Sequence, residues 1–313
     1  MTELTTNASE SNVSVKGFLV LSRLPFLSPG IAALVSGICL AILADYQAEL
    51  GFLLMSIVGL ALIMLATYYF NEYFDYEGDI INKTFIKLSG GSRAIPDNMV
   101  PRTLARVAGY GAVVLLAVIA VIYVLFYFED FPLLLPLALF GAFCGIFYSH
   151  PPFQWSYKGI GEILIGGCYG VLALVSGYYV VSGVLELDMA VVALPASITI
   201  FGVIVANEFP DYEADLAVNK LNLAVRLGVP RASKMYAVLM LLVYPVMVSS
   251  IMVGVDWTIA LYGLPVLLLS SFSAITALKG GYSERAQQMK ISGTALLANL
   301  LSSLMFIPAA IQW

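Results

Sequence analysis

Two stretches of this sequence repeat one pattern of amide and acidic side chains. The segments Asn71-Glu-Tyr-Phe-Asp75-Tyr-Glu-Gly-Asp79 and Asn207-Glu-Phe-Pro-Asp211-Tyr-Glu-Ala-Asp215 agree at six of nine positions and begin 136 residues apart (207 − 71). In each copy the Asn and the last two Asp are spaced i, i+4, i+8, which places them on one face of an α-helix. The repetition predicts two matching helix ends that act together.

Two such ends facing each other would gather four carboxylates and two amides around one cavity. Carboxylates at this density repel one another, so a cation is expected between them. Oxygen ligands without His or Cys favour Mg²⁺, which shares its coordination shell with substrate phosphates. Two matching copies argue against ordinary solvated helix ends. The predicted metal ligands are Asn71, Asp75, Asp79, Asn207, Asp211 and Asp215.

Other charged residues surround the two motifs. The acidic residues on the remaining helix faces are expected to be solvated or paired with basic loop residues, and these are Glu72, Glu77, Glu208 and Glu213. Basic residues near the motifs suit the phosphate groups of a diphosphate, and these are Arg23, Lys83, Lys87, Arg93, Lys220 and Arg226. The segment Gly90-Gly91-Ser92 is flexible enough for its backbone N–H groups to approach phosphate oxygens.

The elements that position these residues are long apolar runs. The chain has 313 residues, of which 60% are hydrophobic and 11% charged, whereas soluble domains are about 25% charged. A helix that crosses a bilayer needs about 20 apolar residues. Nine runs meet this length, at 24–44, 51–72, 104–127, 132–150, 160–182, 189–207, 234–254, 257–278 and 291–311. The fold class is therefore all-α, a polytopic transmembrane bundle of nine helices.

The charges sort between the two sides of this predicted topology. All 15 Lys and Arg residues fall in the N-terminal tail and the loops on its side of the membrane. The positive-inside rule places that side, with both motifs, in the cytoplasm and Trp313 on the opposite side. Residues 1–15 are expected to form a disordered polar tail. Residues 16–313 are expected to form one transmembrane domain with parallel pseudo-repeat halves at about 16–150 and 151–313.

Several classes of site are disfavoured. No basic run indicates nucleic acid, and no feature identifies a protein partner; the partner expected from composition is the lipid bilayer. The three cysteines, Cys39, Cys144 and Cys168, lie within apolar runs and fit neither a disulfide framework nor a zinc site.

The paired motifs resemble those of the UbiA superfamily of intramembrane aromatic prenyltransferases. The family pattern is N-D-x-x-D-x-x-x-D in the first loop and D-x-x-x-D in the second, and Glu72 stands here where the family usually has Asp. The resemblance implies Mg²⁺, an isoprenyl diphosphate donor, a lipophilic aromatic acceptor and release of diphosphate. It also implies that Asn71, Asp75, Asp211 and Asp215 are the central metal and diphosphate residues.

Finer features resemble the menaquinone branch of the family, the 1,4-dihydroxy-2-naphthoate prenyltransferases. They are Gly-Gly-Ser at 90–92, Tyr-Ser-His-Pro-Pro at 148–152, Tyr-Lys-Gly-Ile-Gly-Glu at 157–162 and Asn-Lys-Leu-Asn-Leu-Ala-Val-Arg-Leu-Gly at 219–228. Glu72, Arg93 and Asn222 depart from that branch. Acceptors of other branches therefore stay open, among them 4-hydroxybenzoate, haem, chlorophyllide and archaeal ether lipids.

The resemblance also suggests how the reaction proceeds. Asp75 and Asp211 would hold the metal against the diphosphate, and the ring of Tyr148 would stabilise the allylic cation. The apolar interior would hold the prenyl tail and exclude water. His150 is the only histidine; it and Glu162 are alternative bases, with an interfacial structural role favoured for His150.

A cation-coupled secondary transporter is the main alternative to an enzyme. Transporters also use internal repeats and intramembrane acids, but they bind their substrates near the midplane. Here the acidic residues end their spans and lead into long basic loops, which favours a site at the membrane boundary.

Overall fold

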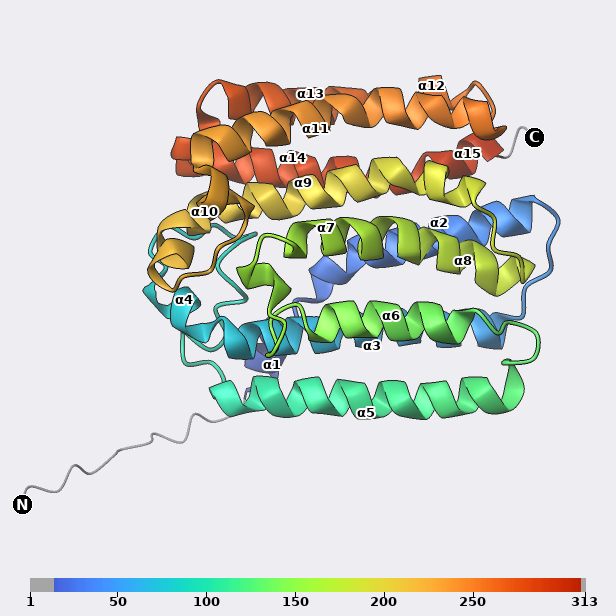
Figure 1. The fold of residues 1–313 in the computed structure, drawn as a ribbon, viewed down its shortest axis with the longest axis horizontal. Coiled ribbons are helices and arrows are strands. Elements are labelled where there is room, and N and C mark those ends of the chain that lie inside the picture. The colour runs from blue at the N-terminus through green and yellow to red at the C-terminus, as the bar shows by residue number, and fades with distance from the viewer. Residues whose placement is uncertain (1–13, 311–313) are drawn as a thin grey trace, which may run out of the picture.

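The computed structural model describes residues 14–310, and these form an all-helical bundle without strands. Figure 1 shows the long helices running side by side, with the short helices α4 and α10 together at one end of the bundle. The tail predicted at 1–15 lies outside this described part of the chain except for Ser14, which caps α1, and Val15, which begins it, so the predicted boundary is too late; Trp313 also lies outside.

The first half of the chain contributes α1 and α2, which are joined by a 3-10 turn, and then α3, α4, α5 and α6. Their bounds are Val15–Leu21, Ser28–Leu43, Leu50–Phe74, Tyr76–Ile81, Arg102–Phe126 and Leu134–Ile146. In the second half, α7 and α8 are joined by a π-helical segment, η3. The bounds here are α7 Gly161–Gly166, η3 Gly167–Leu172, α8 Ala173–Ser182, α9 Asp188–Ala217, α10 Leu223–Leu227, α11 Val229–Ser249, α12 Ile259–Tyr262, α13 Leu264–Leu278, α14 Arg285–Leu304 and α15 Phe306–Ala310.

Eight helical stretches of the described residues are long and apolar enough to cross a membrane. The chain is therefore an integral, multi-pass membrane protein. The fourth predicted span, at 132–150, corresponds to α6, which has only 13 residues. At about 1.5 Å per residue this helix is ~20 Å long, short of a hydrocarbon core of about 30 Å. The chain leaves the helix before Pro151 and Pro152, because residues that precede proline avoid the helical conformation.

A second difference concerns the sixth predicted span, at 189–207. Helix α9 continues to Ala217, and Pro195 and Pro210 lie within it. The helix packs against α14, α11 and α7, and these contacts favour helix continuation despite the hydrogen bonds lost at the prolines. The helix is therefore longer than the predicted span, and it carries the whole second motif on one continuous helix, as the spacing of Asn207, Asp211 and Asp215 predicts.

The two halves of the chain meet closely at α2 and α8. A Cβ added to Gly37 would lie 2.0 Å from the Leu174 carbonyl oxygen, and one added to Gly177 would lie 2.0 Å from the Leu34 carbonyl oxygen. Glycines at both contact points let the two backbones approach, as is typical of helix pairs in membranes. This contact fixes the first half, which carries the first motif, against the second half.

Candidate active site

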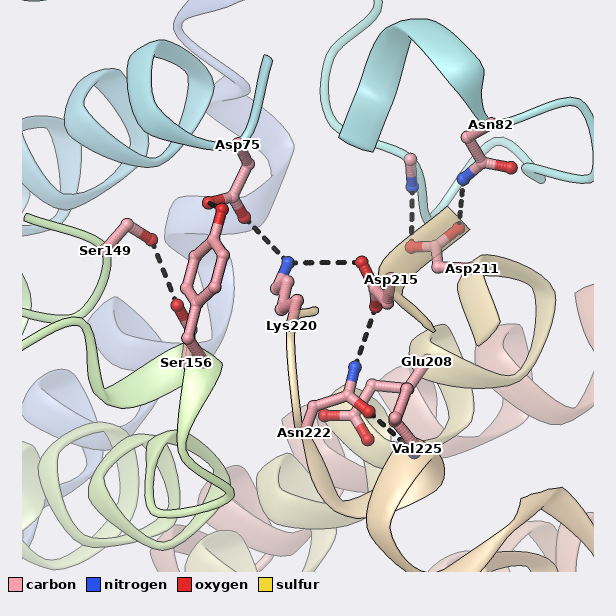
Figure 2. A network of polar contacts seen from close by, with 12 residues as sticks. Asp75, Asn82, Ser149, Ser156, Glu208, Asp211, Asp215, Lys220, Asn222 and Val225 are labelled. Carbon is pink, nitrogen blue, oxygen red and sulfur yellow. Dashed lines mark hydrogen bonds and ion pairs between the residues drawn. The ribbon is translucent and has the colours of Figure 1, made fainter. Parts of the chain in front are cut away.

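The two acidic motifs lie at the same end of the bundle and are connected by Lys220. The Lys220 Nζ lies 2.7 Å from Asp75 Oδ2 and 3.6 Å from Asp215 Oδ1. Figure 2 shows this ammonium between the two carboxylates, with Asp211 nearby on the same helix as Asp215. The two motifs therefore share one polar site, with a positive charge between them.

The first motif does not form one continuous helix, and this expectation was wrong. Helix α3 ends at Phe74, Asp75 caps it, and α4 begins at Tyr76. The Asn71 amide donates hydrogen bonds to Asp75 Oδ2 (2.8 Å) and to Ser149 Oγ (2.9 Å). The Tyr157 hydroxyl donates to Asp75 Oδ1 at 3.1 Å. These contacts hold the Asp75 carboxylate where the two helices bend.

Asp211 binds the loop that follows the first motif. Its Oδ1 accepts hydrogen bonds from Asn82 Nδ2 (2.7 Å) and Ser89 Oγ (2.8 Å), and its Oδ2 accepts one from the Gly90 N–H (3.0 Å). Gly90 has φ +68, and an added Cβ would lie 2.4 Å from the Cβ of Phe85. Glycine is needed there for the turn. The Gly90 N–H, which was expected to approach a phosphate oxygen, therefore binds the Asp211 carboxylate.

Asn222 holds the other oxygen of Asp215. Its Nδ2 donates to Asp215 Oδ2 at 2.7 Å, while its Oδ1 accepts the Val225 N–H at 2.9 Å and so caps α10. This residue departs from the menaquinone-branch pattern, which has Thr at this place. Here the amide joins the cap of α10 to the acidic site.

A pocket with an empty volume of about 1130 Å³ contains these groups. Five carboxylates line it (Asp75, Asp79, Glu208, Asp211 and Asp215) against two cations (Arg23 and Lys220). Burial, followed by the charges of Glu72 and Asp75, raises the pKa of Asp79 well above its usual range. Burial alone lowers the pKa of Lys220, but Asp215 and Asp75 raise it more, so that its net shift is upward. Acidic side chains therefore outnumber basic ones in this pocket.

The donor set of this pocket fits a magnesium ion. All candidate ligands are carboxylate or amide oxygens, and the buried Oδ1 of Asn207 has no hydrogen-bond partner among the described residues. A divalent cation would offset the excess of carboxylates. Among the described residues, no group of three or more His, Cys, Asp or Glu side chains is already arranged to hold a metal ion. Lys220 and the hydrogen-bond donors of the 82–90 loop hold the carboxylates apart.

The predicted basic residues divide into two groups. Arg23 and Lys220 line the pocket. The Arg23 Nη1 lies 3.5 Å from Glu72 Oε1, its guanidinium stacks over Phe26, and its Nε has no partner within the described chain. The others lie outside the pocket lining: Lys83 and Lys87 are exposed, Arg93 donates to the Asp79 carbonyl and stacks on Phe85, and Arg226 donates to the Leu221 carbonyl.

The four glutamates expected to be solvated or paired also divide. Glu77 and Glu213 are exposed as expected, and Glu77 pairs with Arg102 at 3.1 Å. Glu72 and Glu208 are only 1% and 8% exposed, so solvation was wrong for both. Glu72 accepts hydrogen bonds from the Ser92 N–H and hydroxyl, at 2.6 and 2.7 Å, besides its pairing with Arg23. Long-range loop contacts bury these side chains, and helix spacing does not reveal such contacts.

A second, apolar pocket adjoins the polar one at Tyr148. It has an empty volume of about 1260 Å³ and is lined by residues of α2, α3, α5, α6 and the α7–α8 segment. Tyr148, Thr67, Ile165 and Tyr169 line both pockets. His150 packs between the rings of Phe70, Phe74 and Phe147, which fits a structural role. The aromatic ring of Tyr148 therefore stands where the charged and apolar spaces meet.

Sequence reasoning missed several residues that build this site. Asn82 and Ser89 carry no repeated pattern, and their role depends on a contact with Asp211 more than 120 positions away. Tyr157 lies within the 157–162 segment, whose resemblance to a family pattern was a usable signal. Burial and the charge of Asp75 raise the pKa of Tyr157, which keeps its phenol neutral as a hydrogen-bond donor to that carboxylate.

Comparison with known proteins points to one family. The sequence model of the UbiA prenyltransferase family matches residues 30–301. The chain is 23% identical over 222 residues to 1,4-dihydroxy-2-naphthoate octaprenyltransferase of Bacillus subtilis, covering 70% of this chain and 67% of that protein. It is 30% identical over 165 residues to chloroplastic chlorophyll synthase of Oryza sativa, covering 52% of this chain but only 41% of that protein.

Solved structures share the fold. A UbiA homolog from Archaeoglobus fulgidus bound to GPP and Mg²⁺ has a TM-score of 0.61 at 15% identity, covering 95% of this chain and 100% of that one. A UbiA homolog from Aeropyrum pernix K1 has a TM-score of 0.63 at 15% identity, covering 90% and 96%. At these identities the likeness concerns the arrangement of the helices.

Proposed function

The chain belongs to the UbiA prenyltransferase family, whose members transfer prenyl groups with release of diphosphate, and we propose that its donor diphosphate binds between the two acidic motifs. The observation that carries this proposal is the placement of Lys220 between Asp75 and Asp215 at the mouth of an apolar pocket. The polar pocket would bind the diphosphate group of a prenyl diphosphate, and the adjoining apolar pocket would bind its prenyl tail.

The metal partner is Mg²⁺, bound by oxygens of both motifs. It would be held by Asn71, Asp75, Asp79, Asn207, Asp211 and Asp215. The structure of the Archaeoglobus homolog bound to GPP and Mg²⁺ supports this choice of metal. When bound, Mg²⁺ would neutralise the charge that builds up on the leaving diphosphate. Lys220 and Arg23 supply two further positive charges from the chain itself, and both are held in place before substrate arrives.

The apolar pocket is assigned to the prenyl tail. Its lining is almost wholly hydrocarbon from five helical segments, which excludes water from the reacting carbon. Ionisation of the allylic C–O bond leaves a carbocation next to Tyr148, at the junction of the two pockets. The face of an aromatic ring attracts such a cation, most strongly where water is absent. Tyr148 thus acts on the cation, while Lys220 acts on the diphosphate.

The acceptor proposed is 1,4-dihydroxy-2-naphthoate. The match to the Bacillus naphthoate enzyme covers two thirds of both proteins, and a Synechocystis protein that matches at 30% identity over 92 residues is a 2-carboxy-1,4-naphthoquinone phytyltransferase. The chlorophyll synthase matches keep chlorophyllide as the second candidate. The active site is proposed to face the cytoplasm, because all Lys and Arg residues lie at its end of the bundle.

One assay tests the activity. Purified protein in detergent is given geranyl diphosphate and 1,4-dihydroxy-2-naphthoate, with Mg²⁺ or with excess EDTA, and released diphosphate and prenylated product are measured. The proposal requires both products in equal amounts, and only with Mg²⁺. Ion transport by reconstituted protein without any release of diphosphate would instead support the transporter alternative.

A further inference from the structure

Lys220 lies on the short non-helical segment 218–222 between α9 and α10; this segment and the first two residues of α10, 223–224, are here called the Lys220 strap. Two of its side chains contact the acidic site, since Lys220 bridges Asp75 and Asp215 and Asn222 binds Asp215. Its beginning is fixed by hydrogen bonds from the Lys220 N–H to the Asp215 carbonyl (2.8 Å) and from the Leu221 N–H to the Tyr157 carbonyl (3.2 Å). The place of the ammonium depends on this strap.

The other end of the strap is held by two buried carboxyl groups, Glu162 of α7 and Glu208 of α9. Glu162 Oε1 accepts the Leu223 N–H at 2.8 Å, and Glu208 Oε2 accepts the Ala224 N–H at 3.1 Å. These N–H groups open α10 and have no partner within the helix. Glu162 and Glu208 are only 1% and 8% exposed, and Glu162 Oε2 is buried without a hydrogen-bond partner among the described residues.

Burying two carboxyl groups side by side costs free energy, so their retention calls for a reason. A general base would need a carboxylate open to the acceptor, whereas the backbone of α10 occupies one oxygen of each. Figure 2 shows Glu208 close to Asn222 and Val225, with Lys220 between these residues and Asp75. The hydrogen bonds that the two glutamates accept both come from the strap, and Glu208 also lines the polar pocket that contains Lys220.

We propose that Glu162 and Glu208 are positioning residues that fix the Lys220 strap and so hold the Lys220 ammonium in the diphosphate site. The inference rests on the proposed function, because it assigns Lys220 to the donor diphosphate. Without the two acceptors the strap is held only at its beginning and by the contacts of Asn222 with Asp215 and Val225. The ammonium then spends less time between Asp75 and Asp215, and the donor binds more weakly while acceptor binding is unchanged.

The test compares truncation with an isosteric change. Glu162→Ala and Glu208→Ala remove the acceptor oxygen, whereas Glu162→Gln and Glu208→Gln keep an oxygen for the backbone and offer an N–H to the neighbouring carboxyl. Glu213→Ala, an exposed residue of the same helix α9, is the matched control. The Kd of geranyl diphosphate with Mg²⁺ is measured by calorimetry, and the KM of the acceptor by turnover.

The alanine variants should raise the donor Kd about tenfold, the size expected for a lost charge-assisted contact. The glutamine variants and Glu213→Ala should stay within about threefold of the unaltered protein. The acceptor KM should not move. If glutamine weakens binding as much as alanine, or if only the acceptor KM changes, the positioning role is wrong.

A double-mutant cycle shows whether the effect passes through Lys220. In a Lys220→Met background, Glu208→Ala should weaken donor binding no further, because the group that it positions is already absent. Full additivity would overturn the proposal. Should the alanine variants fail to fold, Leu223→Pro removes the N–H that Glu162 accepts at the first position of α10, where proline is tolerated, and should give the same tenfold loss.

Failure of the inference can be told apart from failure of the proposed function. If the unaltered protein binds no geranyl diphosphate with Mg²⁺, the proposed donor site is wrong. If it binds the donor and Lys220→Met weakens that binding, while neither glutamate variant nor Leu223→Pro does, only the positioning role is wrong.

Discussion

Lys220 Nζ and Asp75 Oδ2 lie 2.7 Å apart although the two residues are 145 positions apart in the chain. The contact joins the end of α3 to the strap that follows α9, and so connects the two copies of the acidic motif. Because both groups are largely buried, breaking the pair leaves an uncompensated charge, which is costly. The contact marks the centre of the proposed donor site, and the predictions below start from it.

Removing the charge of one Asp in each motif should abolish most activity. Asp75→Asn and Asp211→Asn keep size and polarity but lose a carboxylate that is expected to bind Mg²⁺. Each should lower kcat/KM by at least about a hundredfold and weaken Mg²⁺-dependent donor binding. Because groups that act as a unit are not additive, the double variant should be scarcely worse than either single one. Steady-state kinetics and thermal melting check both parts.

The exposed Glu77 and Glu213 serve as controls for that experiment. Glu77→Gln and Glu213→Gln lie outside the pocket lining and should retain much of the activity. If the two Glu→Gln variants lose activity while the two Asp→Asn variants keep it, the catalytic acidic residues are the glutamates and not the aspartates. Normal turnover in all four variants would remove the motifs from the mechanism.

Tyr148 is predicted to act through its ring. Tyr148→Phe keeps the aromatic face at the junction of the pockets and should retain most activity. Tyr148→Leu should lower kcat about thirtyfold, the equivalent of a cation–π contact of ~2 kcal/mol in a desolvated site, with little change in donor KM. A loss in the Phe variant equal to that in the Leu variant would show that the hydroxyl, and not the ring, matters.

The apolar pocket should limit the length of the prenyl tail. Ala138 of α6 lines it, so Ala138→Phe fills part of its volume. The variant should use geranyl diphosphate about as well as before, but lose most activity with a donor of eight isoprene units. Leu268→Phe, on the exposed face of α13, should alter neither activity. Equal losses with both donors would place the tail elsewhere.

The acceptor is the most specific part of the proposal. Of a panel containing 1,4-dihydroxy-2-naphthoate, 4-hydroxybenzoate and chlorophyllide, the naphthoate should give the highest kcat/KM, because the 148–152 and 219–228 segments resemble the naphthoate branch. Product mass spectrometry identifies the prenylated compound. Turnover of 4-hydroxybenzoate with none of the naphthoate would rule out this acceptor.

The orientation follows from the basic residues and can be tested by labelling. With Cys39, Cys144 and Cys168 replaced by alanine, Lys87→Cys should react with an impermeant maleimide only after the cell is opened. Glu129→Cys, at the opposite end of the bundle, should react from outside. Both positions are exposed, so a difference reports sidedness. The reverse pattern would invert the topology.

The chain's own composition decided its class. Long apolar runs leave no alternative to helices in a bilayer, because backbone groups there must bond within one segment. The same local reasoning found both acidic motifs, since identical spacing repeats whatever the fold. It failed at α6, which is shorter than the predicted span. It also failed at Asp75, where the first motif bends between α3 and α4.

Only the tertiary structure decided which charges form the site. Among six candidate cations, Lys220 and Arg23 reach the pocket and Lys83 and Lys87 face solvent, although Lys83 and Lys87 lie near a motif in sequence and Arg23 does not. The burial of Glu72, Glu162 and Glu208, and the holding of Asp211 by Asn82 and Ser89, depend likewise on loops that fold back across the helix ends. The spacing of residues along a helix determines which of them share a face. The residues that pack against that face come from segments distant in the sequence. These contacts exist only once the helices have packed.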